Sequence, residues 1–418
     1  MTGDRLLRSA FVVSFGVLCI TFGVFAVIYR VFPAPQIIEA RATVMDLAEH
    51  WRNDLALEPT RHLVPAADPQ RVAFYVEQPA SVPAGSVIIG GLAPDRGLLQ
   101  GATLYDEQGN ELHHWAIDYE ALDPEGEKQE NVMLHGMLAF PDGSIAVAFD
   151  NGNVIARIDA CGEPLWVTPG RYHHVVANGD DDVIWSWVND ILMKLDADTG
   201  KVLTSIHLKR DIIGAQNQYG VFSIRTKEDP DQIIYQGSAF HSNDVEPLTE
   251  ALAPAFPMFD AGDLLISLRE LNLVAVIDPE TGLLKWWKHG PWFRQHDPDF
   301  LPDGRISVFD NQMGLGSSRI IAIDPATDAW DVSFEGGSDI SFYTWQRGTH
   351  QVLDNGAILM TEPERGRVLL ADADGDQIWR REMIFDDTQN HIVTAAAHYS
   401  PGFFEPGAFD CPHRADHD

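Results

Sequence analysis

Apolar residues follow two patterns along the chain: one long run near the N-terminus and many short alternating runs after it. The long run, residues 9–29, has no charged side chain and is rich in Phe, Val, Leu and Ile. About 20 residues at about 1.5 Å each span a hydrocarbon core of about 30 Å. The run therefore predicts an uncleaved transmembrane helix, with a cleaved signal peptide as the alternative.

The charges beside this run bear on the side of the membrane that the remaining chain occupies. Arg5 and Arg8 precede the run and favour a cytoplasmic N-terminus, whereas Arg30 after it opposes this orientation. We expect a membrane-anchored, single-pass protein with its bulk on the periplasmic or extracytoplasmic side. Behind the anchor, apolar residues recur at helical spacing from Ile37 to Trp51, with charged residues between them, which predicts a short amphipathic stalk helix.

Two short patterns then repeat along the chain. One is a strand ending in Asp, a tight turn and a strand with an aromatic residue, most complete from Asp278 to Trp286. The other is a turn such as Asp303-Gly304, followed by alternating apolar residues. Asp and Gly supply the local hydrogen bonds and the positive φ that hairpin turns need, and period-two alternation is typical of half-buried strands. Units of about 40 to 65 residues with four short strands are propeller blades.

Six such units predict an all-β fold, a six-bladed β-propeller with an N-terminal transmembrane helix and a short stalk helix. The blades are expected to begin near Val87, Asn131, Arg171, Ser238, Phe293 and Phe342. Residues 209–237 are predicted to be an insertion between blades. The expected parts are an anchor over residues 1–34, a stalk and linker over 35–85, the propeller over 86–386 and a tail over 387–418. The way the ring closes stays open.

Charge and cysteine content narrow the function classes. The chain has 29 basic and 62 acidic residues, a formal net charge of -33, so its field repels nucleic acid and anionic lipid surfaces. No C-x-x-C motif suggests a thiolate zinc site. Cys161 and Cys411 either form a disulfide, if the domain lies in an oxidising compartment, or remain free thiols.

Histidines recur at one position of the repeat, ahead of the glycine turn. The five are His135, His174, His241, His296 and His350. Equivalent positions of successive blades face one central channel, so these side chains are expected to converge. One such histidine alone would be interpreted as structural, but five at the same repeat position indicate a site. By contrast, His113 and His114 lie beside Trp115 on a predicted outer strand and are interpreted as structural.

A histidine cluster is suited either to a metal or to an anion. Neutral imidazole is a common metal ligand, but neither an H-E-x-x-H motif nor a His-x-His pair accompanies it here. We therefore expect no metal and no cofactor. For an anion, one imidazole would act as nucleophile and the others as donors. Arg269, at the end of a strand-like segment, and Arg319, after Ser317-Ser318, offer fixed positive charges.

At these residues the chain resembles the arylsulfotransferase family, bacterial enzymes that use no nucleotide cofactor. Residues 295–311 with Ser318-Arg319 look like the segment that holds the family's nucleophilic histidine. Residues 241–245 with Arg269 are similar to the segment that supplies a second histidine and an arginine. Tyr172-His173-His174-Val175 resembles the segment that supplies a third histidine of the family's site, which would be His174 or else His173.

The resemblance implies a ping-pong transfer of a sulfuryl group from a small aryl sulfate to a phenol. His296 would attack sulfur and form sulfohistidine, while His174, His241 and Arg269 neutralise charge on the sulfuryl oxygens and the leaving phenolate. Asp297 and Asp299, close behind His296, would oppose binding of a sulfate. A second set of residues is expected to bind substrate: His135, His173, His350, Asn311 and Arg319.

Other propeller functions fit the repeat less fully. The Asp-x-x-Thr-Gly-x-x-x-Trp pattern also occurs in quinoprotein-like propellers, so a non-catalytic binding or scaffold propeller of the cell envelope is the main alternative. A quinone-dependent dehydrogenase would show about eight repeats and usually adjacent cysteines. A lactonase-type metal propeller would have a channel richer in carboxylates than in histidines.

Overall fold

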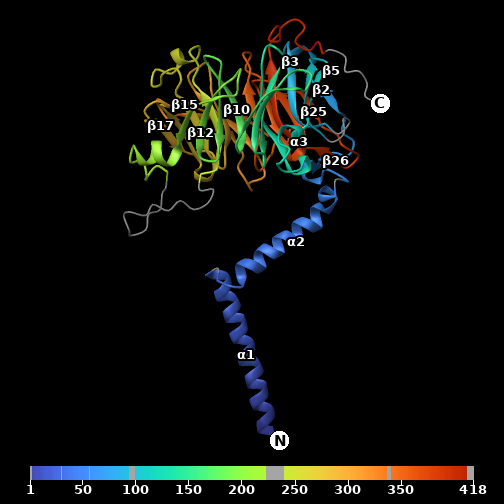
Figure 1. Ribbon diagram of the computed structural model, residues 1–418, viewed down its shortest axis with the longest axis vertical. Coiled ribbons are helices and arrows are strands. Elements are labelled where there is room, and N and C mark those ends of the chain that lie inside the picture. Colours follow the sequence, from blue (N-terminus) through green and yellow to red (C-terminus); the bar gives the residue numbers. More distant parts are fainter. Residues whose placement is uncertain are drawn as a thin grey trace. The chain divides into compact units, whose positions relative to one another are not determined.

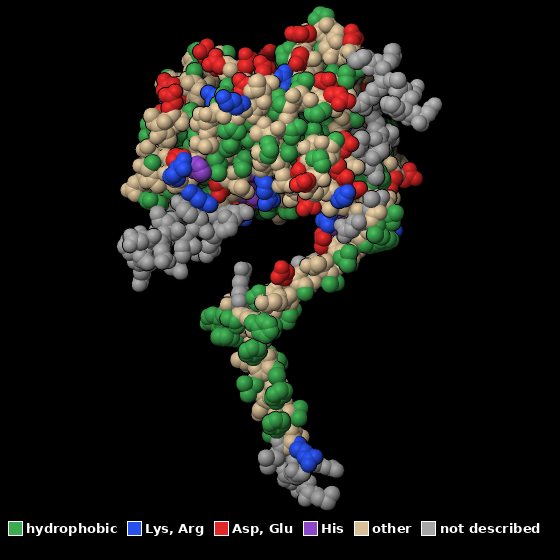
Figure 2. All heavy atoms as spheres, in the orientation of Figure 1, with side chains coloured by type: hydrophobic (Ala, Val, Ile, Leu, Met, Phe, Trp, Pro, Cys, Tyr) green, Lys and Arg blue, Asp and Glu red, His purple; other side chains and the backbone are tan. Residues whose placement is uncertain are grey.

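The computed structural model describes residues 2–29, 31–55, 57–93, 99–222, 240–336 and 340–411. It divides into two compact units, residues 1–61 and 62–418. The first contains α1 (Thr2–Ile28) and α2 (Ala34–Asp54). Residues 8–28 of α1 are long and apolar enough to cross a membrane, as the sequence predicts, and Figure 2 shows hydrophobic side chains along this helix. The predicted stalk helix corresponds to α2.

The second unit is a six-bladed β-propeller, and the predicted fold is confirmed. Figure 1 shows the blades coloured in chain order. Each blade is an antiparallel sheet with a four-stranded core, and we number the blades from the N-terminus. Blade 1 has the order β27–β3–β4–β5, formed by Val393–Tyr399, Ser86–Ala93, Leu99–Asp106 and Glu111–Ile117. Blade 2 has the order β6–β7–β8–β9, formed by Met133–Ala139, Ile145–Asp150, Val154–Ile158 and Pro164–Pro169.

The next three blades follow the same order from the innermost strand outward. Blade 3 contains β10 (Tyr172–Gly179), β11 (Val183–Val188), β12 (Ile191–Asp196) and β13 (Val202–His207). Blade 4 contains β14 (Ser242–Pro247), β15 (Leu264–Leu268), β16 (Leu273–Ile277) and β17 (Leu284–His289). Blade 5 contains β18 (His296–Phe300), β19 (Ile306–Asp310), β20 (Arg319–Ile323) and β21 (Trp330–Glu335).

Blade 6 has a fifth strand from the region predicted to be linker. Its order is β22 (His350–Val352), β23 (Ile358–Glu362), β24 (Arg367–Ala371), β25 (Gln377–Glu382) and β2 (Phe74–Val76). A further two-stranded sheet joins β1 (Leu63–Pro65) to β26 (Gln389–His391). Short helical elements complete the fold: α3 (Tyr119–Leu122), and η1 (Thr60–His62), η2 (Pro79–Ser81), η4 (Gln129–Asn131), η5 (Leu208–Gly214), η6 (Ala253–Ala255), η7 (Arg269–Leu271) and η8 (Pro363–Arg365).

Apolar residues alternating along the strands pack each blade against the next. A buried cluster occupies every one of the six blade interfaces, for example Trp187 of blade 3 with Ile266 of blade 4. The predicted Asp-x-x-Thr-Gly turn lies between β16 and β17, where the Thr281 hydroxyl donates to Asp278 Oδ2 at 2.6 Å and Gly282 has φ 71°. The hydrogen bonds within the turns and the burial of apolar residues between blades therefore favour the same hairpins.

The ring closes through a strand that lies in the predicted tail. β27 is the innermost strand of blade 1 and pairs with β3, so residues from both ends of the chain share one blade. The propeller thus extends past residue 386. Of the predicted insertion, η5 and the turn after it are described, whereas the expected start of blade 4 near Ser238 lies outside the described residues.

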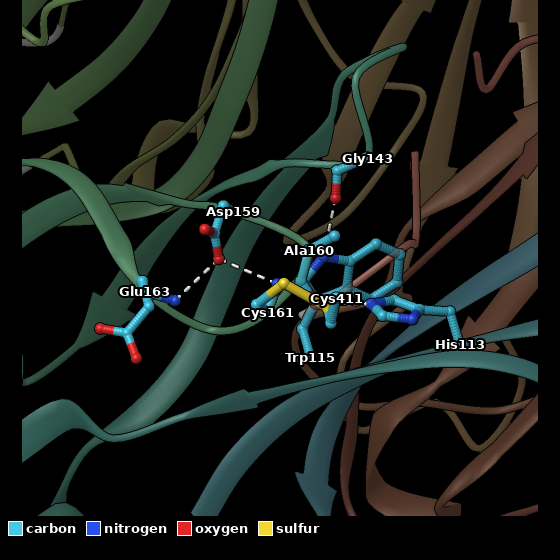
Figure 3. Close-up of a disulfide and its surroundings, with 8 residues drawn as sticks. All are labelled: His113, Trp115, Gly143, Asp159, Ala160, Cys161, Glu163 and Cys411. Carbon is cyan, nitrogen blue, oxygen red and sulfur yellow. Dashed lines mark hydrogen bonds between the residues drawn. A yellow bond between two sulfur atoms is a disulfide. The ribbon is translucent and has the colours of Figure 1, made fainter. Parts of the chain in front are cut away.

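A disulfide links the chain that follows β27 to blade 2. Cys161, in the β8–β9 turn, bonds to Cys411 with 5.5 Å between the Cα atoms (Figure 3). Asp159 shapes that turn, because its Oδ1 accepts hydrogen bonds from the backbone N–H groups of Cys161 and Glu163. Of the two states open to these cysteines, the structure contains the disulfide.

Candidate active site

The innermost strands share a local irregularity that shapes the channel. Five of the six, all except β22, have a register shift against the next strand of their blade. Near these shifts His174, His241 and Asp297 have positive φ values of 67°, 49° and 49°. Bulges turn side chains out of the strand alternation, and left-handed backbone at non-glycine residues concentrates at functional sites. Because of these irregularities, the side chains of several histidines point in directions that regular strand alternation would not give them.

His296, the first residue of β18, is buried and held through one ring nitrogen. Its Nδ1 lies 2.7 Å from Oδ1 of Asn311. The Asn311 amide nitrogen donates to the carbonyls of Thr344 and Arg347, so Oδ1 is the atom that faces the imidazole and must accept from Nδ1–H. Nε2 of His296 is buried and has no hydrogen-bond partner among the described residues. A neutral His296 therefore keeps its lone pair on Nε2.

Hydrogen bonds also indicate the tautomers of the neighbouring histidines. His173 Nε2 lies 3.2 Å from the Asn189 carbonyl and must donate to it, which leaves Nδ1 of His173 to accept from Nδ1–H of His174 at 2.7 Å. In this arrangement Nε2 of His174 carries a lone pair. The ring of His174 lies between those of His135 and His241, with centroid separations of 4.2 and 5.1 Å. The predicted convergence of these histidines is therefore observed.

Arg269 lies in η7, directly after β15, and borders the cluster through His241. Its Nη2 donates to Nδ1 of His241 at 3.2 Å and also contacts Glu270 at 3.2 Å. Because Nδ1 accepts, a neutral His241 has its proton on Nε2. Nε of Arg269 is buried and has no hydrogen-bond partner among the described residues. The guanidinium therefore supplies positive charge and retains a free donor.

Burial keeps these imidazoles neutral at neutral pH. It lowers the pKa of His135 to about 3 and that of His241 to about 4, with Arg269 adding to the effect on His241. It also lowers the pKa of His174 and His296 well below the usual value of 6.5. Desolvation disfavours the imidazolium form, and the neighbouring histidines and Arg269 oppose a further positive charge. The cluster is thus a set of neutral bases and donors.

Two adjoining cavities surround the cluster. One, of about 220 Å³, is lined by His135, His174, His296, His350 and Arg347, among others. The second, of about 450 Å³, is lined by His173, His174, His241, Lys209 and Arg171, among others. His174 lies at both. Both linings combine imidazoles and an arginine, which suit an anion, with carboxylates: Asp244 and Asp297 in the first cavity, and Asp150 and Asp190 in the second.

His350 differs from the other four histidines because carboxylates surround it. Its Nδ1 lies 3.0 Å from Asp297 Oδ2, and its Nε2 lies 2.9 Å from the Ser307 hydroxyl. Burial alone would lower the pKa of His350, but Asp299 and Asp297 outweigh burial and raise it. His350 therefore lines the cavity as a charged or strongly hydrogen-bonded group, with both nitrogens already engaged.

Arg319 is not brought to these cavities. Its Nε donates to the buried carboxylate of Asp310 at 2.8 Å, and its guanidinium lies over Trp330. The ion pair with Asp310 and the contact with the Trp330 ring hold the Arg319 side chain on blade 5. His113 and His114 lie on β5, the outer strand of blade 1, where they contact the Ala160 carbonyl and the Thr103 hydroxyl at 2.8 and 2.9 Å.

Arg347 is a cavity residue that the sequence reasoning missed. It lines the same cavity as His296, and its guanidinium lies 3.5 Å from both Asp150 and Glu364. The sequence does contain a pattern that could have identified Arg347. In three units, an arginine precedes the channel histidine by two or three residues. These pairs are Arg171 with His174, Arg294 with His296, and Arg347 with His350.

Fold and site together define a six-bladed β-propeller with a histidine- and arginine-lined channel. The model of the arylsulfotransferase (ASST) family matches residues 136–384. The chain therefore belongs to the arylsulfotransferase family, which confirms the resemblance seen in the sequence. No curated protein matches the chain.

Similar solved structures are distant. A protein of unknown function from Bacteroides caccae is 11% identical over 75% of this chain and 98% of its own, with a TM-score of 0.47. Virginiamycin B lyase from Staphylococcus aureus is 12% identical over 61% and 71%, with a TM-score of 0.36. BamB from Moraxella catarrhalis is 11% identical over 75% and 88%, with a TM-score of 0.35. These similarities carry no information about activity.

Proposed function

We propose that the protein transfers a sulfuryl group from an aryl sulfate to a phenol, with His296 as the nucleophile. The observation that carries this proposal is the state of His296: Nδ1–H donates to Asn311, and Nε2 is buried and without a partner among the described residues, in a residue that lines the cavity. A neutral imidazole with a fixed tautomer and a free lone pair is prepared for nucleophilic attack. Family membership supports the same reaction class.

In the first half-reaction Nε2 of His296 attacks sulfur. The N–S bond forms as the bond between sulfur and the aryl oxygen breaks, and the phenolate leaves with the electron pair. Nε2–H of His241 and the guanidinium of Arg269 are the nearby donors for the sulfuryl oxygens and the phenolate. A bound anion also raises the pKa of His174 and favours protonation of its Nε2. His174 then passes this proton to the departing phenolate, which leaves as the phenol, and Nε2 of His174 is again free to accept a proton.

In the second half-reaction a phenol collects the group. Its oxygen attacks sulfur as its proton passes to Nε2 of His174, the N–S bond breaks, and the electron pair returns to Nε2 of His296. His135 and Arg347 line the cavity where the substrates would lie, whereas Asn311 acts through His296 as a positioning residue. Atoms and charge balance without a cofactor.

The proposed location is the extracytoplasmic side of a membrane, with α1 as anchor. Two observations support it: α1 has the length and composition of a membrane span, and Cys161 and Cys411 form a disulfide. Disulfides persist in oxidising compartments and are rare in the cytosol. Aryl sulfates and phenols are small enough to reach such a domain from outside the cell.

A turnover assay tests this function. Full-length protein in detergent is mixed with 4-nitrophenyl sulfate and phenol, and nitrophenolate release is followed. We expect turnover with parallel double-reciprocal lines, its abolition in His296→Ala, and normal turnover in His289→Ala, a histidine of the outer strand β17. No turnover by wild type, or an active His296→Ala, would reject the enzyme and leave a non-catalytic binding propeller.

A further inference from the structure

The two faces of the propeller carry different loops. Strands of an antiparallel blade alternate in direction, so the turn between the third and fourth strands lies at the end opposite to the start of the innermost strand. In all six blades that turn contains an aspartate that accepts a backbone N–H of the same turn: Asp106, Asp159, Asp196, Asp278, Asp324 and Asp372. We call this end the aspartate face. The opposite end, near which the innermost strands carry their histidines, is the histidine face.

Positive charge gathers at the histidine face of blades 3 to 6. Arginines lie in the segments that lead into the innermost strands and in the turns between second and third strands: Arg171, Arg269, Arg294, Arg347 and Arg365. Figure 2 shows acidic side chains spread along the upper edge of the propeller and Lys, Arg and His side chains gathered along its lower edge. The acidic stretch of the histidine face, residues 118–130, connects blades 1 and 2. Over blades 3 to 6 this face is therefore the one that lipid phosphates repel least.

An apolar rim lies on the histidine face of blades 5 and 6. Its members are Phe293, Leu315 and Trp345, with exposed fractions of 42, 68 and 44%. The backbone N–H of Gln312 donates to the Phe293 carbonyl at 3.1 Å. The backbone N–H of Gly314 donates to the Tyr343 hydroxyl at 3.0 Å, so the loops that carry the three side chains adjoin one another. The rim is thus one region of the surface, formed by three loops.

The chain enters the propeller at the same face. His62 is buried, and its Nε2 lies 2.8 Å from the carbonyl of Val132, directly before β6. The carbonyl of His62 accepts from the backbone N–H of Ile392, directly before β27. Both β6 and β27 are innermost strands that begin at the histidine face. The segment that follows α1 and α2 therefore joins the propeller beside the channel histidines.

The connection to α1 can keep this face at a bilayer. α2 has 21 residues and is about 30 Å long. It exposes apolar side chains at helical spacing, namely Ile37, Val44, Leu47 and Trp51, to between 45 and 65%. Lipid at a bilayer interface covers such a row, so α2 suits a position along the membrane surface better than one surrounded by water. Residues 55–61 then separate the membrane surface from His62.

The site is accessible from the histidine face. Exposed loop residues of this face line the cavity of about 450 Å³ together with two of the imidazoles: Asn151, Arg171, Asn189, His174 and His241. In the loop that carries Leu315, Asn311 holds the ring of His296 through Nδ1. A molecule that arrives at this face therefore reaches the imidazoles without crossing the aspartate face.

We propose that the histidine face docks on the bilayer that holds α1, with Phe293, Leu315 and Trp345 in the lipid interface, and that this bilayer supplies the phenol. Tryptophan, aliphatic and arginine side chains are groups that membrane interfaces favour. The acceptor is then a phenol with a long hydrocarbon chain, which dissolves in lipid, whereas the charged aryl sulfate stays in water. Docking rests on α1 as the anchor, and only the choice of acceptor rests on the proposed function.

Fluorescence quenching by lipid tests the docking. Full-length protein with Cys19→Ser, which removes the free thiol of α1, is placed in phosphatidylcholine nanodiscs that contain lipid with a nitroxide headgroup. The fluorophore NBD is attached at Leu315→Cys, at Trp345→Cys or at Leu283→Cys, an exposed position of the aspartate face. We expect quenching of about twofold or more at the first two positions and almost none at the third, because the nitroxide acts only on groups at the interface.

Two results would overturn the docked face: no quenching at the first two positions, or equal quenching at all three. If Leu315→Cys fails to fold, as judged by near-ultraviolet circular dichroism, the folded Trp345→Cys variant decides by the same criterion.

Acceptor preference tests the source of the phenol. In nanodiscs with 4-nitrophenyl sulfate as donor, phenol is compared with 4-dodecylphenol. We expect kcat/KM to be about 10-fold or more higher for 4-dodecylphenol, with this preference lost in Leu315→Asp/Trp345→Asp and kept in Leu283→Asp. Equal values for the two phenols in wild type, or a preference that survives in the double variant, would reject the bilayer as source. Quenching without turnover would reject sulfuryl transfer and support the docked face, whereas turnover without quenching would reject the docked face alone.

Discussion

Asn311 Oδ1 and His296 Nδ1 lie 2.7 Å apart, and both residues are buried in the channel. The two carbonyls that accept from Asn311 Nδ2 fix the orientation of the amide, and the amide in turn fixes the tautomer of the imidazole. This relationship leaves the lone pair of His296 on Nε2. The reactivity that we propose depends on a contact behind the nucleophile as much as on the nucleophile itself.

Substitution of Asn311 tests this dependence. We expect Asn311→Ala to lower kcat/KM by about 10- to 100-fold, because the imidazole loses its fixed tautomer and orientation. Asn311→Asp should instead raise the pKa of His296 and move the acid limb of the pH profile to higher pH, an effect that a packing role would not produce. Asn355→Ala, in an exposed turn, is the control. Unchanged kinetics in Asn311→Ala would show that the contact is not used.

The pH profile reports the neutral state of the cluster. The pKa of His296 is lowered well below 6.5 and that of His241 to about 4, so both imidazoles stay neutral as the pH falls through 6.5. We expect kcat/KM, measured with 4-nitrophenyl sulfate, to hold its plateau there and to decline only toward about pH 4. An acid limb centred near pH 6.5 would mean that the nucleophile is not desolvated as described.

Substitution of two arginines in contrasting environments can distinguish a role in anion binding from a general effect of charge on activity. Arg269 contacts His241 and keeps a buried free donor, whereas Arg305 pairs with Asp303 and Asp331 at the surface. We expect Arg269→Lys to lower kcat/KM by about 100-fold, because a lysine cannot reproduce the planar donor set. Arg305→Lys should change it by less than about twofold, as exposed ion pairs contribute little. Equal effects of the two substitutions would contradict the assignment of Arg269.

The disulfide is expected to stabilise the closed ring. Cys161 and Cys411 are 250 residues apart, so the bond restricts a long loop of the unfolded chain. We expect Cys161→Ser/Cys411→Ser to lower the free energy of unfolding by about 2 to 4 kcal/mol, measured as a lower Tm that no longer responds to reductant. Cys19→Ser, which removes the free cysteine of α1, should leave the reductant response intact. A double variant as stable as wild type would show that the bond adds nothing to the fold.

The sequence predicted those features that repeat or that local chemistry determines. The Asp278–Gly282 turn carries its own hydrogen bonds, and period-two alternation marks the buried faces of the blades, so six blades could be counted. The same position of the repeat brought His135, His174 and His296 to one cavity, and His241 into contact with His174. Each of these inferences needs only a short stretch of sequence and the symmetry of the ring.

Features that depend on pairing between distant residues could not be predicted. β27 carries no turn motif of the repeat and joins β3 about 300 residues away, a register that only closure of the ring determines. Arg319 resembles a site residue in sequence, yet the buried carboxylate of Asp310 binds it. The tautomer of His296 follows from carbonyls in the segment before β22, which no local pattern around His296 reveals.

Intact mass after incubation with donor alone tests the central claim most directly. Full-length protein is exposed to 4-nitrophenyl sulfate without phenol and analysed by mass spectrometry, with peptide mapping of the modified residue. We predict a gain of one sulfuryl group on His296, absent in His296→Ala, present in His289→Ala and removed when phenol is added. Release of nitrophenolate without a covalent adduct, or an adduct that persists in His296→Ala, would contradict the account.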